Sequence, residues 1–300
     1  MPRSPRSAPS RAGLPPGTRA VLLRALREDR FEADRTTRAL LARPVPARAR
    51  ITAQGEGVLS GAQAAAATAR LAGVSVRRVA RDGSRVVRGS RVLELSGDAR
   101  RILSAERTML NLLMHLSGIA TATGRAVEAV GAAGGRMEVR GTRKTLPGLR
   151  DLEKQAIVHG GGHPHRRDLA TGLLVKNNHL VLLPVPEAVA RLRRLPRPRP
   201  RIEVEVRRIA EARAAIRAGA EELLVDNRRP AAAARMVAAI RALPGGRHLP
   251  IELSGGITPE NVARYAGSGA DAVSLGSLTH SARALPFHLS LRRTRPSAPP

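Results

Sequence analysis

Cysteine is absent from this 300-residue chain, and several other residue types are scarce. Without a thiol, the chain can form no disulfide, no thiolate metal site and no cysteine nucleophile. Aromatic residues make up only 1% of the sequence, so the hydrophobic core must be built from Ala, Val, Leu and Ile. No apolar run reaches the ~18 residues that a membrane span requires. We therefore expect a soluble, cytoplasmic protein.

Lysine is nearly absent as well. Of the 52 basic residues only Lys144, Lys154 and Lys176 are lysines, which leaves 49 arginines. The net charge of +28 is of a kind that attracts nucleic acid, but the arginines are scattered along the chain beside Ala, Gly and Pro, which indicates a compositional bias instead. A lysine retained against this bias indicates a site that needs the compact charge of an ammonium group and not the planar guanidinium group of arginine. The alternative is that the three lysines were retained by chance.

The two ends of the chain differ in composition from the middle. Residues 1–17 and about 291–300 are rich in Pro, Ser and Arg, which is typical of unfolded ends. We expect a disordered tail over 1–17, an N-terminal domain over 18–117, a second domain over 118–285, and a C-terminal segment and tail over 286–300.

The pattern between residues 20 and 118 predicts a small domain of helices and strands. Short runs that contain Val and Ile, separated by glycines, surround an Ala-rich helix at 62–72, and a further helix is expected at 20–26. Apolar residues at helical spacing then predict a long helix from about Ser104 through Met114, ending near Gly118.

After residue 135 the pattern alternates between strand, loop and helix, which predicts parallel βα units. Strands are expected in RMEVRGT, GLLVKNNHL, RIEVEV, ELLVDN, PIELSGGI and DAVSLGSL. Each carries polar residues at its C-terminal end, which is where (β/α) barrels place their active sites. Because only six strands are evident, the α/β fold predicted here is an irregular, incomplete barrel preceded by a smaller α/β domain.

Basic residues gather around the retained lysines, between positions 140 and 180. They are Arg140, Arg143, Arg150, Arg166, Arg167, His165 and His179. Cations that converge on one pocket repel each other unless an anion occupies it, and arginine forks suit carboxylates and phosphates, so we expect a small ligand with several negative charges. A solvated basic face would explain Arg150 and Arg167 but not Lys176, which ends an apolar strand. Lys154, in the helical pattern DLEKQA, is interpreted as structural.

Two later segments offer a place for a phosphate. SGGITPEN follows a strand with two glycines and puts Pro259 near the start of a helix, and LGSLTH follows the next strand. Barrel enzymes often bind phosphate with the loops of their last two strands.

Acidic residues close two neighbouring strands. Glu205 and Asp226 could bind ribose hydroxyls or a divalent metal, or stabilise a cationic sugar carbon, and Glu203 on the same strand face could share that role. Each could equally be a salt-bridge partner of one of the many arginines. The histidines of HGGGHPH favour anion binding by His165 over a metal cluster.

Eight segments, in order, resemble the quinolinate phosphoribosyltransferase family. They are ERTMLNLLMHLSGIAT, TRKTLPGLRDLEKQA, GGGHPHR, LLVKNNH, EVEV, LLVDN, SGGI and LGSLTHS, spanning about residues 104–283. The combination of TRKT-PG-R with GGG, HR and K-x-NH is the most specific part. The resemblance implies transfer of a phosphoribosyl group from phosphoribosyl pyrophosphate to quinolinate, with loss of pyrophosphate and CO2, to give nicotinate mononucleotide for NAD biosynthesis. It also implies an N-terminal α/β sandwich domain joined to an irregular α/β barrel.

The resemblance carries residue roles onto this sequence. It assigns the two carboxylates of quinolinate to Arg143, His165, Arg166 and Lys176. It assigns phosphoribosyl pyrophosphate to Lys144, and the ribose and substrate-bound Mg2+ to Glu205 and Asp226, so that Lys144, Glu205 and Asp226 are the catalytic candidates. Thr142 is a further substrate-binding candidate. It assigns the 5′-phosphate to Ser254, Gly255, Gly256, Gly276 and Ser277. It further implies a homodimer in which Arg107 reaches the partner's site.

The sequence departs from the family pattern at three positions. Gly141, Thr171 and Asn177 stand where the family usually or often has an acidic residue. This loss removes metal-binding or charge-balancing capacity, although the ligand-contacting positions are intact and we expect an active enzyme. The rival hypotheses are a molybdenum-associated protein of the same fold, which K-x-NH argues against, and a non-catalytic paralogue that binds nucleic acid or a partner through its basic surface.

Overall fold

A computed structural model describes residues 14–294 of the chain. These residues divide into two compact units: unit 1 holds residues up to 122, 146–161 and from 282, and unit 2 holds 123–145 and 162–281. Helix α4 (Ala99–Ala132) contributes to both, with residues 99–122 in unit 1 and 123–132 in unit 2. The domain limits expected from the sequence stay a prediction, and residues 1–13 and 295–300 of the expected tails lie outside the described residues.

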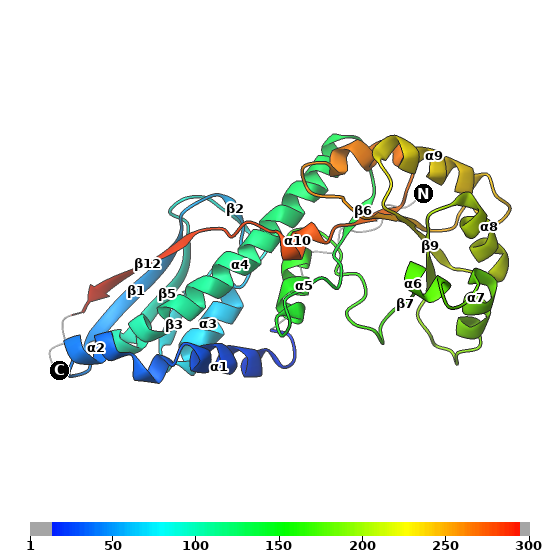
Figure 1. Cartoon of the computed structure of the whole chain (residues 1–300). Helices are drawn as coiled ribbons and strands as arrows, with labels where there is room; N and C mark the ends of the chain where they lie inside the picture. The colour runs from blue at the N-terminus through cyan, green and yellow to red at the C-terminus, as the bar shows by residue number, and fades with distance from the viewer. Residues whose placement is uncertain (1–13, 295–300) are drawn as a thin grey trace. The chain divides into compact units, whose positions relative to one another are not determined.

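Unit 1 is built around a four-stranded antiparallel sheet in the order β12-β1-β5-β3 (Figure 1). Its strands are β1 (Pro46–Ala53), β3 (Ser75–Val79), β5 (Arg91–Asp98) and β12 (Phe287–Arg293), beside a small pair of β2 (Gly57–Val58) and β4 (Arg85–Val86). Its other helices are α1 (Thr18–Glu28), η1 (Phe31–Ala33), α2 (Arg35–Leu40), α3 (Ala62–Leu71) and α5 (Arg150–His159). The predicted separate N-terminal α/β architecture is confirmed.

One face of this sheet forms the core of unit 1. Along β1, Ala47, Ala49 and Ile51 are buried while Arg48 and Arg50 between them are exposed, as the period of two in a strand requires. The same buried cluster contains residues of α3 and α4: Ala65, Ala66, Ala69, Ile102, Ala105 and Met109. The core is therefore packed largely from aliphatic side chains, as the scarcity of aromatics demands.

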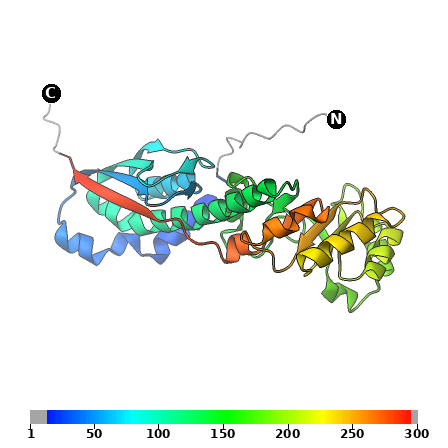
Figure 2. The same ribbon diagram turned by 90° about the horizontal axis from the view of Figure 1, so that it is seen from above.

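Strand β12 corrects one expectation. Residues 291–300 were expected to be unfolded, but β12 pairs with β1 from Ala53↔Phe287 to Ala47↔Arg293 (Figure 2). The prediction is wrong for 291–293. Composition alone misleads here because the long-range pairing with β1 satisfies the backbone of an Arg-rich segment.

Helix α4 corrects a second expectation from the sequence. It was expected to end near Gly118 but continues to Ala132. A Cβ at Gly118 would lie 2.5 Å from the backbone oxygen of Arg283. Gly118 therefore serves close approach of another segment within unit 1 and does not end the helix.

Unit 2 contains a six-stranded parallel sheet in the order β6-β11-β10-β9-β8-β7. The strands are β6 (Glu138–Arg140), β7 (Leu173–Val175), β8 (Ile202–Val206), β9 (Glu222–Asp226), β10 (Ile251–Ser254) and β11 (Ala272–Ser274). The helices are α6 (Asn177–Leu180), α7 (Val185–Arg193), α8 (Ile209–Ala218), α9 (Pro230–Arg241), η2 (Val262–Ser268) and α10 (Ser277–His280). No backbone ladder joins β6 to β7 within the described residues, so the six predicted strands form an incomplete barrel, as expected.

The arrangement of unit 2 brings its polar strand ends together. Helices α7, α8 and α9 and then η2 follow one another along one side of the strands (Figure 1). Asp226 at the end of β9 pairs in register with Ser254 at the end of β10, and Glu205 lies near the end of neighbouring β8. The residues before these ends are buried, whereas these three are partly accessible.

In the described part of the chain, no helix has both the length and the hydropathy needed to cross a membrane.

Candidate active site

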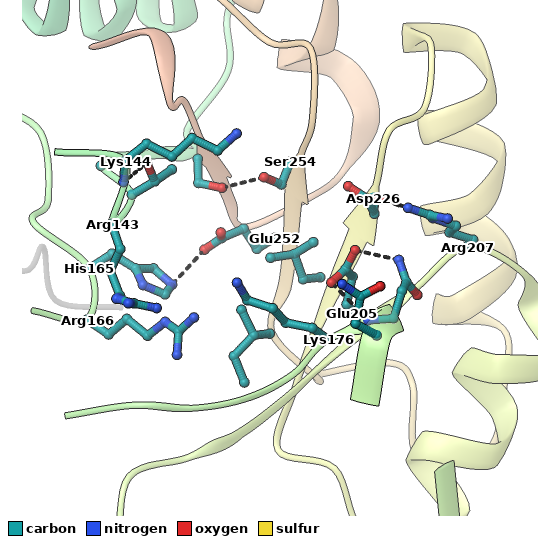
Figure 3. A pocket seen from close by; sticks show the side chains of 17 residues that line it. Arg143, Lys144, His165, Arg166, Lys176, Glu205, Arg207, Asp226, Glu252 and Ser254 are labelled. Carbon is teal, nitrogen blue, oxygen red and sulfur yellow. Dashed lines mark hydrogen bonds and ion pairs between the residues drawn. The ribbon is translucent and has the colours of Figure 1, made fainter. Parts of the chain in front are cut away.

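A cavity of 380 Å³ lies at the C-terminal ends of the unit 2 strands. Its volume suits a small ligand. Its lining residues are Gly141, Thr142, Arg143, Lys144, His165, Arg166, Leu174, Lys176, Asn177, Asn178, Glu205, Arg207, Leu224, Asp226, Glu252, Ser254 and Ser274. Nine of the residues proposed from the sequence therefore meet in one cavity, drawn in Figure 3.

Cations occupy one side of the cavity. Arg143, His165 and Arg166 lie together in Figure 3, with Lys176 pointing in from the end of β7. Burial and the charge of neighbouring Arg143 lower the pKa of Arg166. The buried Nε of Arg143 has no hydrogen-bond partner among residues 14–294. Repulsion and an unpaired donor both indicate that this side is built to receive an anion.

Carboxylates occupy the opposite side. Burial and the adjacent charge of Asp226 raise the pKa of Glu205, although the backbone N–H of Asn177 acts against them. That N–H donates to Glu205 Oε2 at 3.2 Å, and the Asn177 side-chain amide donates to Oε1. Arg207 donates from Nε and Nη2 to Asp226 Oδ2, at 3.0 and 2.8 Å. The cavity is thus polarised, with cations facing carboxylates.

The carboxylate side has the chemistry of a magnesium site. Two carboxylates and an amide are hard oxygen donors, which Mg2+ prefers. Burial and, after it, the charge of Asp226 raise the pKa of Glu205, and a divalent cation would offset the repulsion between the two carboxylates. Glu205 and Asp226 therefore fit the expected ion, although Arg207 already neutralises part of the charge of Asp226.

Lys144 is held against the proposed phosphate loops. A Cβ at Gly276 would lie 2.8 Å from Lys144 Cδ, and Thr279 Oγ1 donates to the Lys144 carbonyl at 2.7 Å. Ser277 Oγ donates to the Ile257 carbonyl at 3.3 Å and so links the two loops. Although Gly255, Gly256, Gly276 and Ser277 do not line the cavity in the described structure, their loops adjoin lining residues Lys144 and Ser254.

Gly255 shows why the first loop needs glycine. Its φ is +90°, and a Cβ there would lie 2.8 Å from the backbone nitrogen of Asn227. The helix expected after this loop is instead the 3-10 helix η2, which begins at Val262, three residues beyond Pro259. The expected α-helix near Pro259 is therefore not present among the described residues. Exposed backbone N–H groups of the turn remain the available donors.

Several charged residues expected near the ligand lie elsewhere. Arg140 does not line the cavity in the described structure because its guanidinium is held by buried carboxylates. Glu203 lies deeper in the barrel than Glu205 and also does not line the cavity. Lys154 is buried in α5 of unit 1, consistent with its structural interpretation, and Arg150 begins the same helix.

Two further residues stand outside the described cavity. The Nδ1 of His179 accepts from the backbone N–H of Lys176 at 2.9 Å, so this histidine caps α6. Arg107 lies in α4 of unit 1, and its assignment to a partner's site stays a prediction.

Sequence reasoning missed four polar lining residues. They are Asn178, Arg207, Glu252 and Ser274. Glu252 carried a usable signal, because it is a charge inside the otherwise apolar strand PIELS. Arg207 carried none, because arginines are common throughout the chain.

Parallel strands that end in facing cations and carboxylates around one cavity define a barrel enzyme for a small, multiply anionic substrate. The chain belongs to the quinolinate phosphoribosyltransferase family. The model of that family's C-terminal domain matches residues 119–290, and the N-terminal domain model matches residues 34–117. The family predicted from the motifs is confirmed.

Sequence similarity to known relatives extends over nearly the whole chain. A probable nicotinate-nucleotide pyrophosphorylase (carboxylating) from Methanothermobacter thermautotrophicus is 37% identical over 91% of this chain and 98% of its own length. The nicotinate-nucleotide pyrophosphorylase (carboxylating) of Homo sapiens is 38% identical over 93% of both chains. The crystal structure of NadC from Streptococcus pyogenes superimposes with a TM-score of 0.86 at 34% identity, covering 95% of this chain and 100% of that one.

Proposed function

We propose that this chain transfers the phosphoribosyl group of phosphoribosyl pyrophosphate to quinolinate and releases pyrophosphate and CO2. The product is nicotinate mononucleotide, and the reaction belongs to NAD biosynthesis. The observation that carries the proposal is the polarised cavity, in which Arg143, Arg166 and Lys176 face Glu205 and Asp226. A dicarboxylate fits the cationic side, and a ribose that becomes cationic fits the carboxylate side.

The first step forms the bond between the pyridine nitrogen and C1′ of the sugar while the bond from C1′ to pyrophosphate breaks. The cations hold both carboxylates of quinolinate and so aim the ring nitrogen at C1′. Glu205 and Asp226 stabilise the positive charge that develops on the sugar as pyrophosphate departs. When bound, Mg2+ held by these two acids would offset the charge of the pyrophosphate.

The second step is loss of the carboxylate next to the ring nitrogen. N-alkylation makes the pyridine ring cationic, so the ring accepts the electron pair left behind when CO2 departs. A proton then replaces the carboxylate on the same carbon. No organic cofactor is required for this balance.

The assembly and location of the chain are part of the proposal. We propose a cytoplasmic homodimer in which each site receives Arg107 from the partner subunit. The charge argument supports this, because another cation on the cationic side suits a substrate with two carboxylates beside a phosphorylated donor.

The proposal is tested by mixing the purified chain with quinolinate, phosphoribosyl pyrophosphate and Mg2+ and following nicotinate mononucleotide by chromatography. We expect product only when all three are present. Absence of product across a range of salt concentrations would refute the enzymatic function. RNA binding that weakens steeply with salt, in a chain without turnover, would instead support the non-catalytic alternative.

A further inference from the structure

A buried ion-pair cluster lies in the barrel beside the cavity. Arg140 Nη1 donates to Glu222 Oε1 at 2.6 Å and to Glu252 Oε2 at 2.8 Å. On its more exposed side, Arg140 also donates to Glu138 Oε2, from Nη2 at 3.0 Å and from Nε at 3.2 Å. The Glu252 side chain is only 2% exposed, whereas that of Glu138 is 45% exposed. The cluster therefore extends from the barrel interior toward solvent.

Glu252 connects this cluster to the proposed site. His165 Nε2 lies 3.3 Å from Glu252 Oε2, the same oxygen that receives Arg140 Nη1. Burial alone would raise the pKa of Glu252, but the hydrogen bond and charge of His165 and the charge of Arg140 outweigh it and leave the pKa below its ordinary value. Glu252 is thus a buried carboxylate held jointly by Arg140 and His165.

The shared oxygen determines which ring nitrogen of His165 meets a ligand. With Nε2–H donating to Glu252, Nδ1 is the nitrogen left to face a substrate carboxylate, to which it donates when it also carries a proton. Glu203 Oε2 lies farther from the same nitrogen, at 3.7 Å. The orientation of the ring therefore depends on Glu252 and on what holds Glu252.

We propose that Arg140 is a positioning residue for quinolinate: by holding Glu252 Oε2, it fixes the His165 ring in the orientation that binds a substrate carboxylate. This inference rests on the proposed function. Arg140 itself does not line the cavity in the described residues, so it acts through Glu252 and His165.

A metal ion is the competing explanation for these groups. Ligand atoms of His165, Glu203 and Glu252 lie within 4.8 Å of one another, a spacing that a cation could bridge. However, the Arg140 guanidinium already contacts the Glu252 oxygen that faces His165, and it would repel a second cation there. The arginine therefore takes the place that a metal would need.

Kinetics of three variants test the inference. Arg140→Met should raise KM for quinolinate by at least ~10-fold, because Glu252 loses the cation that holds it in place beside His165, while kcat and KM for phosphoribosyl pyrophosphate change much less. Arg140→Lys should recover most of this loss, because it restores a cation beside Glu252. Glu138→Gln, which removes only the exposed partner of Arg140, is the matched control and should leave all constants unchanged. Equal losses for both substrates would overturn the inference.

A double variant separates positioning from folding. Arg140→Met/Glu222→Leu replaces a buried ion pair by apolar groups, a change that proteins often tolerate, but still leaves Glu252 without its cation. We expect a folded protein that keeps the raised KM for quinolinate. Recovery of the wild-type KM in this variant would show that Arg140 is merely structural and would overturn the inference.

The ring protons of His165 give a readout that needs no turnover. In protein with 15N-labelled histidine, the signal lost in His165→Gln identifies the ring. With quinolinate bound, we expect protons on both ring nitrogens in the wild type and loss of the hydrogen-bonded Nε2 proton signal in Arg140→Met. An unchanged signal in Arg140→Met would overturn the inference even in an active enzyme. Absence of wild-type turnover with the expected signals would instead refute only the proposed function.

Discussion

Lys176 is the residue at which the choice of cation matters most. It follows the apolar strand β7 and lines the cavity, in a chain where arginine is otherwise the usual base. We predict that Lys176→Arg loses roughly 100-fold in kcat/KM for quinolinate although the charge is kept, because a planar fork displaces the substrate by about an ångström. Arg167→Lys, the reverse exchange at a side chain 60% exposed, is the control and should stay active. Near-normal turnover of Lys176→Arg would refute the lysine argument.

Glu203 gives the stability of the fold a dependence on pH. Burial and the charges of Glu252 and Glu222 raise its pKa to about 9, from an ordinary value of 4.5. Between these values the unfolded chain releases a proton that the folded chain keeps, so stability falls as pH rises, by up to ~1.4 kcal/mol per pH unit from this group. We predict that Glu203→Gln removes this slope, so that its thermal stability relative to the wild type grows from pH 5 to pH 9 in calorimetry.

Glu221 provides a control of opposite sign. The hydrogen bond from Arg199 lowers the pKa of Glu221, so its contribution to stability is present above its ordinary pKa and is lost as pH falls through the lowered value. Glu221→Gln should therefore be less stable than the wild type at neutral pH, with a difference that shrinks in acid. Parallel stability curves for the wild type and Glu203→Gln would contradict the account of Glu203.

Individual site residues were predictable to different degrees. The retained lysines and the motif TRKT indicated Lys144, Lys176 and Arg143, and all three line the cavity. The sequence wrongly placed Arg140 beside the ligand. The residues next to Arg140 in the sequence do not reveal that Glu222 and Glu252, from strands far along the chain, bind its guanidinium. Partners of this kind are set by the order of strands in the sheet and not by spacing in the sequence.

At the scale of elements, the loop after β10 makes the sharpest prediction. Because Gly255 has a φ of +90° and no space for a Cβ, Gly255→Ala should shift the loop, raise KM for phosphoribosyl pyrophosphate and destabilise the fold by about 1–3 kcal/mol. The control is Gly131→Ala in α4, where a Cβ would meet nothing within 4 Å and should stabilise the helix by up to about 1 kcal/mol. Equal KM values in both variants, measured beside denaturant unfolding, would argue against a phosphate role for the loop.

The order of elements in unit 2 followed from sequence because each parallel strand combines a short apolar run with a polar end. All six expected strands are present, and within residues 14–294 they form one parallel sheet. Two element boundaries did not follow. Gly118 suggested a helix end although it permits close packing against Arg283, and β12 needs a partner, β1, more than 200 positions away in the chain. Both depend on tertiary contacts that local patterns do not encode.

At the scale of the whole molecule, a shared site predicts rescue between two inactive variants. Arg107→Ala and Lys144→Ala should each abolish activity alone. If Arg107 serves the partner's site, an equal mixture that exchanges subunits restores about one quarter of the sites of a dimer, since each mixed dimer holds one intact site. Chromatography with light scattering checks that dimers form, and the activity assay measures the rescue. No rescue in a mixture shown to contain mixed dimers would mean that Arg107 does not cross between subunits.

The central claim is that one polarised cavity joins quinolinate to a phosphoribosyl donor and then removes one carboxylate. It is tested most directly by the stoichiometry of a single reaction with quinolinate labelled at the carboxylate next to the ring nitrogen. The account predicts equal amounts of nicotinate mononucleotide, pyrophosphate and labelled CO2, with none of the three formed when quinolinate is omitted. Pyrophosphate released without nicotinate mononucleotide, or label retained in the nucleotide, would contradict it.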